Sequence, residues 1–286
     1  MVGFTLHPQG SFALKESVEF GFGQRHSERF AGVMRLAFVL DGYAEQVGVV
    51  LRQDDAGVHG EISGEADPAL VERQVARILS LDHDGRVFDG LGARDPVLAR
   101  LQQQRPGLRP PLFHSPYEAA VWAIISTRRP AHVAAGLRDR LSRTHGRVFE
   151  LDGQELAALP TPARLLEVEE VEGLPADRVS RLHGVARFAL TGGLDADRLL
   201  AMGPEEATAW VQQVPGVGPF YASLIVIRAT GFADVLPTRE PRLLALVQRL
   251  YDLPTEPDPG ELEALAEAWR PMRTWAAVLI RAAGCT

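Results

Sequence analysis

The carboxylate of Glu240 is the side chain in this sequence whose position most favours catalysis. It stands between Arg239 and Pro241 in the segment VLPTREPRLL. Proline favours the first position of a helix, so Glu240 is predicted at a helix start. A carboxylate fixed in a dry site can stabilise a developing positive charge and orient an attacking water molecule. The alternative is a solvated glutamate that only interacts with the positive end of the helix dipole.

A helix-hairpin-helix pattern precedes this carboxylate. One helix is predicted from Pro204 to Val214, followed by the turn Pro215-Gly216-Val217-Gly218 and a second helix from Pro219 onward. Glycine permits the positive φ or the close approach that such a turn requires, and amide groups at a helix start can donate to a phosphate oxygen. The pattern therefore predicts binding of Gly216, Val217 and Gly218 to a DNA backbone. A plain helical turn is the alternative.

Composition excludes several classes of protein. The chain has 286 residues, 46% of them hydrophobic and 23% charged, which is typical of a folded protein with more than one domain. No apolar run approaches the roughly 20 residues that span a bilayer, and the N-terminus does not resemble a secretion signal, so a cytoplasmic protein without a membrane partner is expected. Cys285 is the only cysteine, and we expect no catalytic metal. The net charge of -7 means that DNA binding would need a local basic patch.

Two kinds of periodicity divide the chain. From Phe4 to about Gly64, apolar and polar residues alternate, as in SFALKESVEFGF and AEQVGVVLRQ, which predicts an antiparallel sheet. Asp67 and Pro68 then predict the start of a helix. From Pro116 onward almost every segment has the helical period, so a helical assembly is predicted.

The first of these later helices is predicted to begin with a capping box formed by Ser115 and Glu118, and Pro130 is predicted to open the next. Between them lies the turn Thr127-Arg128-Arg129. The second helix carries four arginines that could form the basic patch, although a solvated helix face is the alternative: Arg138, Arg140, Arg143 and Arg147.

Together these motifs resemble the helix-hairpin-helix DNA glycosylases, and more narrowly the bacterial 3-methyladenine DNA glycosylase II, or AlkA, type. The resemblance covers residues from about 113 to the end, in the family's order: SPYEAAVWAIISTRRPAHVAAGLRDRL, GLPADRVSRLHGVARFAL, VPGVGPFYASLIVIRATGFADVLPTREPRL and AEAWRPMRTWAAVLIRAAG. It implies an α+β fold with a two-lobed helical core. The implied domains are an N-terminal sheet domain (1–87), a helical domain carrying the hairpin (113–230), and a second helical domain made of 88–112 and 231–286.

The resemblance implies a monofunctional N-glycosylase that flips a damaged base out of double-stranded DNA and hydrolyses its N-glycosidic bond. Leu236-Pro237 is similar to the pair that precedes the family's catalytic aspartate, which places Glu240 at the catalytic position. A one-residue shift would place Arg239 there instead. Relatives that also nick the strand carry a lysine two residues after the second hairpin glycine. That position is Phe220 here, so no lyase activity is implied.

The resemblance also implies a base pocket and a wedge. The pocket positions are Phe220, Leu224, Arg281 and Trp122, and the wedge Thr127-Arg128-Arg129 would fill the gap left by the flipped base. An arginine in the pocket could hydrogen-bond a neutral base but would repel a cationic one.

No cofactor is implied apart from a monovalent cation at the hairpin, and the protein is expected to act as a monomer. The alternatives are a non-catalytic relative that binds lesions and a helical scaffold for protein partners.

Overall fold

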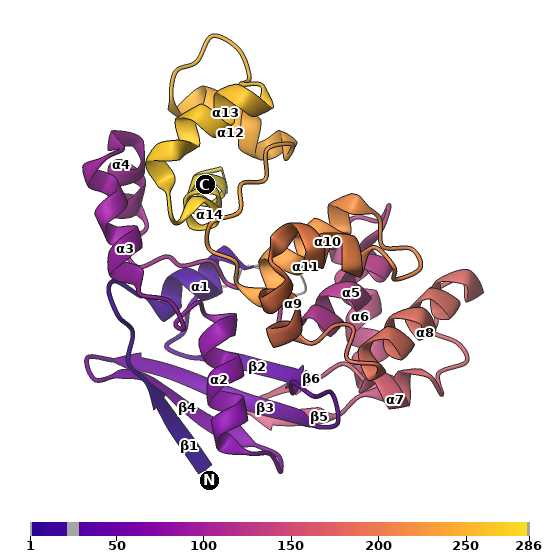
Figure 1. Cartoon of the computed structure of the whole chain (residues 1–286). Helices are drawn as coiled ribbons and strands as arrows, with labels where there is room; N and C mark the ends of the chain where they lie inside the picture. The colour runs from indigo at the N-terminus through magenta and orange to yellow at the C-terminus, as the bar shows by residue number, and fades with distance from the viewer. Residues whose placement is uncertain (1, 22–28, 285–286) are drawn as a thin grey trace.

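The N-terminal part of the chain is an antiparallel sheet with two helices (Figure 1). A computed structural model describes residues 2–21 and 29–284, so Cys285 lies outside the described residues. The sheet has the strand order β1-β4-β3-β2, and α2 packs against β1 and β4. Its elements are β1 (Val2–Leu6), α1 (Leu14–Phe20), β2 (Met34–Val39), β3 (Gln46–Asp54), β4 (Gly57–Ser63) and α2 (Pro68–Ile78).

Two sequence predictions for this part are confirmed and one is wrong. The AEQVGVVLRQ stretch forms β3, and α2 begins with the Asp67 side chain accepting a hydrogen bond from the amide of Ala69. The SFALKESVEFGF stretch was predicted as a strand, but its residues Leu14–Phe20 form α1. Leu14 and Val18 both enter the core, and a spacing of four satisfies a helix as well as an alternating strand. The alternation could not distinguish the two.

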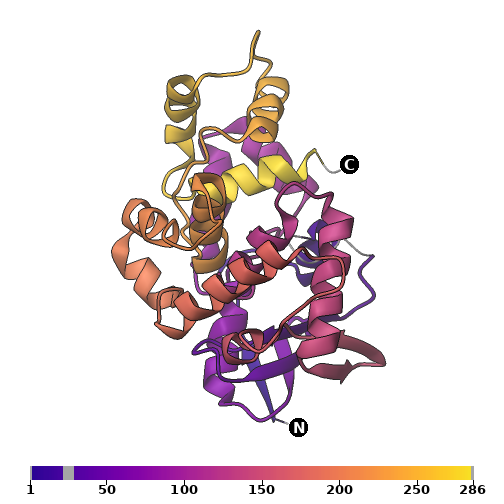
Figure 2. The ribbon, with the colours of Figure 1, turned by 90° about the vertical axis from the view of Figure 1, so that its right-hand side faces the viewer.

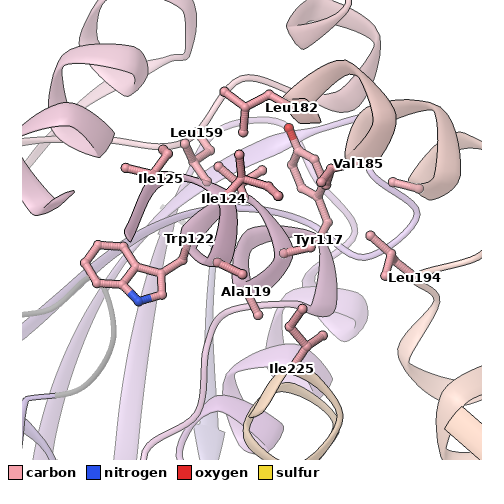
Figure 3. Packing of buried hydrophobic residues seen from close by; sticks show 14 of the residues in the cluster. Tyr117, Ala119, Trp122, Ile124, Ile125, Leu159, Leu182, Val185, Leu194 and Ile225 are labelled. Atoms are coloured by element: carbon pink, nitrogen blue, oxygen red, sulfur yellow. The ribbon is translucent and has the colours of Figure 1, made fainter. Parts of the chain in front are cut away.

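The first helical lobe has one apolar core, part of which is shown in Figure 3. Tyr117, Ile124 and Leu182 are all fully buried in it. The lobe contains α5 (Pro116–Ser126), α6 (Ala131–His145), α7 (Pro162–Leu165), α8 (Ala176–Leu190), α9 (Ala196–Met202), α10 (Pro204–Val211) and α11 (Pro219–Thr230).

A β-hairpin interrupts this lobe where only helices were predicted. Its strands β5 (Val148–Leu151) and β6 (Gln154–Ala157) are joined by Asp152 and Gly153, both with positive φ. An Asp-Gly pair between alternating residues is a strong local signal for such a hairpin. The hairpin packs beside β2 and β3, where Arg35 donates to the carbonyl oxygen of Leu151.

The second helical lobe is assembled from two separate parts of the chain. Asp95 joins them, because its Oδ2 accepts hydrogen bonds from the Tyr251 hydroxyl (2.6 Å) and the Trp269 indole (2.9 Å). The elements are α3 (Gly85–Asp89), η1 (Gly90–Ala93), α4 (Pro96–Gln104), α12 (Pro241–Leu250), α13 (Pro259–Ala266), η2 (Glu267–Trp269) and α14 (Arg273–Ala282). Figures 1 and 2 show α12 and α13 at the end of the molecule opposite the sheet. The predicted α+β fold with a two-lobed helical core is confirmed, and the exact domain boundaries stay a prediction.

A buried carboxylate ties the sheet to the first lobe. The Glu118 side chain accepts hydrogen bonds from the Val39 amide at 2.9 Å and from Arg138 at 3.2 Å, and it lies 3.1 Å from His114 Nδ1. Burial alone would raise the pKa of Glu118, but His114, Arg138 and the Val39 amide outweigh it and hold that pKa below its ordinary value. Ser115 caps α5 as predicted. The Glu118 half of the capping box is wrong, because its carboxylate is used in this cluster.

None of the helices in the described ranges has the length and apolarity needed to cross a membrane.

Candidate active site

The two glycines of the hairpin turn have different physical roles. Gly216 has φ of +89°, and an added Cβ would lie 2.8 Å from Cδ of Arg181, so the fold itself requires glycine there. Gly218 has φ of −83°, which any residue adopts, and an added Cβ would meet nothing within 4 Å. Gly218 also starts α11 without a side-chain cap. Its open side and the uncapped helix start together suit the close approach of a phosphate.

Val217 supports the hairpin turn from the core side. Its side chain is buried in the first lobe's core, and its amide donates to the carbonyl oxygen of Val214 at 3.0 Å. Val217 therefore anchors the turn from inside, and its contact with DNA stays a prediction.

We expect Gly218→Ala to weaken DNA binding without weakening the fold. The added methyl group should change the free energy of unfolding by less than about 0.5 kcal/mol, since it meets no protein atom, yet lower duplex affinity by about tenfold if a phosphate approaches there. Fluorescence anisotropy with a duplex at low salt measures the affinity. Gly90→Ala is the matched control, because Gly90 is equally open but lies in the second lobe. Equal affinity for the two variants would contradict the role of Gly218.

Glu240 is both the N-cap of α12 and a member of an ion pair. Its Oε2 accepts a hydrogen bond from the Leu243 amide at 2.7 Å, and Pro241 occupies the first turn, as predicted. Its Oε1 lies 2.6 Å from Nη1 of Arg281. The Glu240 side chain is 21% exposed, whereas the neighbouring Arg239 is exposed. The structure therefore gives Glu240, rather than Arg239, a fixed position.

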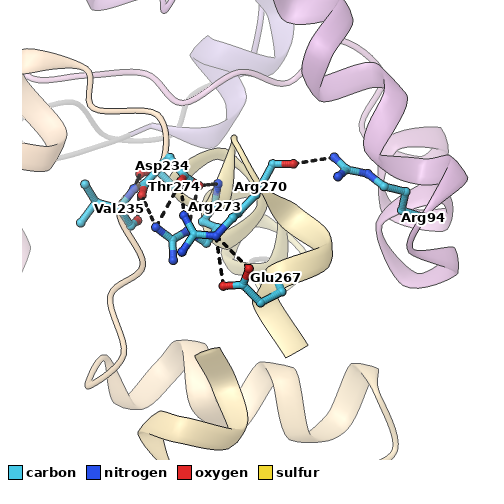
Figure 4. A network of polar contacts seen from close by, with 7 residues as sticks. All are labelled: Arg94, Asp234, Val235, Glu267, Arg270, Arg273 and Thr274. Carbon is cyan, nitrogen blue, oxygen red and sulfur yellow. Dashed lines mark hydrogen bonds and ion pairs between the residues drawn. The ribbon is translucent and has the colours of Figure 1, made fainter. Parts of the chain in front are cut away.

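The loop that carries Glu240 is clamped to the start of α14 (Figure 4). The carboxylate of Asp234 accepts hydrogen bonds from Nε of Arg273 at 2.8 Å and Nη1 of Arg270 at 2.8 Å. Thr274 Oγ1 both accepts from the Val235 amide and donates to the Val235 carbonyl, each at 2.9 Å. Arg281 lies two turns further along α14, so one helix holds the loop and also supplies the cation that pairs with Glu240. Asp234 was not identified from the sequence, because nothing in its local pattern indicates these partners.

The pocket candidates Trp122, Phe220 and Leu224 lie on α5 and α11, which pack against each other. Phe220 is 63% exposed in the first turn of α11, with its ring against Tyr221, and Leu224 lies one turn further along, half-buried on the lobe's core. Trp122 is 8% exposed, and Figure 3 shows its indole pointing away from Tyr117 on the other side of α5. The contacts described for these three residues are to their own lobe. Among the predicted site residues, the side chains of Glu240 and Arg281 form an ion pair.

The predicted wedge is an exposed, tightly held turn. Arg128 has φ of +59°, a left-handed conformation that is uncommon for a residue with a side chain. On either side, the Thr127 hydroxyl donates to the Ala123 carbonyl at 2.6 Å and the Arg129 amide donates to the Ser126 carbonyl at 3.0 Å. These bonds present Arg128 to solvent at the tip. Backbone strain of this kind often accompanies a functional position.

The predicted basic patch stays a prediction: Arg138, Arg140 and Arg143 lie on α6 and each has a carboxylate partner, whereas Arg147 lies beyond the end of α6 at His145. Arg138 pairs with Glu118, Arg140 with Glu172, and Arg143 with Asp139 and Glu155, while Arg147 packs over the Phe149 ring. The carboxylates come from distant parts of the sequence as well as from α6, so charge along one helix could not reveal the pairing. Arg128 at the wedge remains exposed.

Comparison with known proteins agrees with this geometry. No family model matches the chain. The chain is 27% identical over 225 residues to DNA-3-methyladenine glycosylase 2 of Escherichia coli, covering 77% of this chain and 74% of that protein. It is 28% identical over 207 residues to a probable bifunctional transcriptional activator/DNA repair enzyme AlkA of Mycobacterium tuberculosis, covering 70% of this chain but 40% of that longer protein.

Solved structures share the whole fold. The 3-methyladenine DNA-glycosylase from Archaeoglobus fulgidus superimposes with a TM-score of 0.76, at 21% identity, over 98% of this chain and 97% of that one. In sequence and in fold the chain is similar to helix-hairpin-helix glycosylases. An 8-oxoguanine glycosylase/lyase of Clostridium acetobutylicum, solved with double-stranded DNA, has a TM-score of 0.68 at 17% identity over 100% of this chain and 99% of that one, which shows a shared fold alone. The two relatives named above are a DNA-3-methyladenine glycosylase and a probable DNA repair enzyme AlkA.

Proposed function

We propose that the chain is a monofunctional DNA N-glycosylase of base excision repair, which flips a damaged base out of a duplex and hydrolyses its N-glycosidic bond. The observation that carries the proposal is the fixed carboxylate of Glu240 at the start of α12, held by a loop that α14 clamps. The hairpin supplies an open helix start for the backbone, and Arg128 supplies an exposed side chain for the gap in the stack.

The chemistry needs a negative charge rather than a nucleophilic side chain. As the bond from C1′ to the base nitrogen breaks, both electrons leave with the base and the sugar becomes cationic. The carboxylate of Glu240 stabilises that cation and orients the water whose oxygen bonds to C1′. Phe220, exposed at the start of α11, is proposed to stack on the flipped base.

The absence of strand cleavage is part of the proposal. Cleavage requires a lysine amine that forms an imine with the sugar, and Phe220 occupies the hairpin position where relatives with that activity have lysine. The chain's one lysine, Lys15, lies in α1 of the N-terminal part. We further expect a monomer that acts on chromosomal DNA in the cytoplasm, and a monovalent cation at the hairpin stays a prediction.

Single-turnover excision tests the proposal. Duplexes that each carry one 3-methyladenine, 7-methylguanine, ethenoadenine, hypoxanthine or uracil are incubated with excess protein, and half of each sample is then treated with alkali. Cleavage that appears only after alkali is the expected result, because it reports an abasic site in an unbroken strand. Cleavage without alkali would contradict the monofunctional assignment. Binding without excision of any lesion would support the non-catalytic relative.

Asp234→Asn tests whether the clamp positions Glu240. The amide cannot accept as strongly from the two arginines, so we expect kcat to fall about tenfold through misplacement of the carboxylate, with KM changed by less than about threefold. Glu267→Gln is the matched control, because Glu267 pairs with Arg270 in the same network without touching the loop. An equal loss of kcat in both variants would show a general effect on the lobe instead.

A further inference from the structure

The contact between Glu240 and Arg281 alters the charge of the active site. Oε1 of Glu240 lies 2.6 Å from Nη1 of Arg281, and both side chains are largely shielded, at 21% and 33% exposed. The other carboxylate oxygen accepts from the amide of Leu243 at the positive end of α12. The negative charge that would stabilise a sugar cation is therefore offset by the positive guanidinium of Arg281.

This guanidinium affects different bases in opposite ways. A neutral damaged base leaves C1′ with the bonding electrons as an anion, whereas a base alkylated on a ring nitrogen is cationic beforehand and leaves as a neutral molecule. A fixed positive charge attracts the departing anion and repels the bound cation, and such effects are strong where water is excluded. The departing anion then takes one proton of the attacking water, and the other stays on the new 1′-hydroxyl group.

We infer that Arg281 determines the substrate class, and that the site selects neutral damaged bases that leave as anions over cationic alkylated bases. The inference rests on the proposed N-glycosylase function. Arg281 lies in the last turn of α14, whose first turn clamps the loop of Glu240, so the two charges are held together by one structural unit. Arg281 is a specificity-determining residue, and Glu240 remains the catalytic carboxylate.

The test compares excision of bases of different charge by the wild type and by Arg281→Leu. Hypoxanthine and ethenoadenine represent neutral bases, and 7-methylguanine represents a cationic base. Each base is placed in the same duplex sequence. Each single-turnover excision rate is divided by the rate at which that base is lost spontaneously. We expect the wild type to accelerate loss of the neutral bases at least tenfold more. Arg281→Leu should lower the excision rate of the neutral bases by roughly a hundredfold, because it removes one preorganised charge. It should not lower the excision rate of 7-methylguanine. Arg249→Leu removes an exposed arginine of the same lobe as the control.

The outcomes separate this inference from the proposed function. A loss of excision that is equal for neutral and cationic bases in Arg281→Leu would overturn the inference, because a purely structural role lowers both alike. Preferred excision of 7-methylguanine by the wild type would also overturn it while supporting glycosylase activity.

Excision of no base at all would refute the proposed function, and binding then decides the inference. Fluorescence anisotropy compares duplexes that contain hypoxanthine or 7-methylguanine. Tighter wild-type binding to the hypoxanthine duplex, equalised in Arg281→Leu, supports charge selection by Arg281. Equal wild-type binding to both duplexes overturns it.

Discussion

Glu240→Gln is expected to abolish excision while leaving the fold and DNA binding intact. Glutamine keeps an oxygen that can accept the Leu243 amide, so the start of α12 should persist, but it carries no charge to stabilise the sugar cation. We expect the single-turnover rate to fall by at least about a hundredfold, as when one preorganised electrostatic group is removed. Affinity for a lesion duplex should change by less than about threefold, which corresponds to under 1 kcal/mol.

Two further variants show whether this effect is specific to the carboxylate. Arg239 is the exposed neighbour that would occupy the catalytic position if the alignment with the family were shifted by one residue. Arg239→Gln should leave the single-turnover excision rate at saturating protein unchanged. Glu240→Asp shortens the side chain by one methylene group and restores the family's residue, so it should retain measurable excision. If Glu240→Gln excised at the wild-type rate, the carboxylate would serve only as the cap of α12.

Glu118→Gln is expected to cause the largest loss of stability. The change removes a buried negative charge and leaves Arg138 and His114 without their shared partner, which typically costs roughly 3–5 kcal/mol. Urea denaturation at pH 7 measures the free energy of unfolding. Glu169→Gln, on an exposed loop, is the control and should change that free energy by less than about 0.5 kcal/mol.

The pH dependence gives a second signature of Glu118. Its pKa is lower in the folded protein than its ordinary value of 4.5, so its contribution to stability is present above that value and is lost as the pH falls through the folded-state pKa. The difference between wild type and Glu118→Gln should therefore shrink on acidification below about pH 4. A difference that stays constant from pH 7 to pH 3 would show that packing, not charge, explains the loss.

The sequence alone determined the local features of this protein, because they depend on neighbouring residues. Proline and capping residues marked the starts of α2, α5, α11 and α12, and two glycines marked the hairpin. Glu240 was placed at its helix start for the same reason. Local patterns were insufficient where one spacing satisfies both a helix and a strand, as at α1.

Only the tertiary structure decided what the charged side chains do. Glu118 was predicted to complete a cap within its own helix, but in the fold it joins β2 to α5 and α6. Arg138 was predicted to face DNA, but it pairs with the buried carboxylate of Glu118, which lies on another helix. Long side chains choose partners by proximity in space and by the need to compensate buried charge, and neither is encoded in sequence spacing. The pairing of Glu240 with Arg281, 41 positions apart, could be found only once α12 and α14 were packed together.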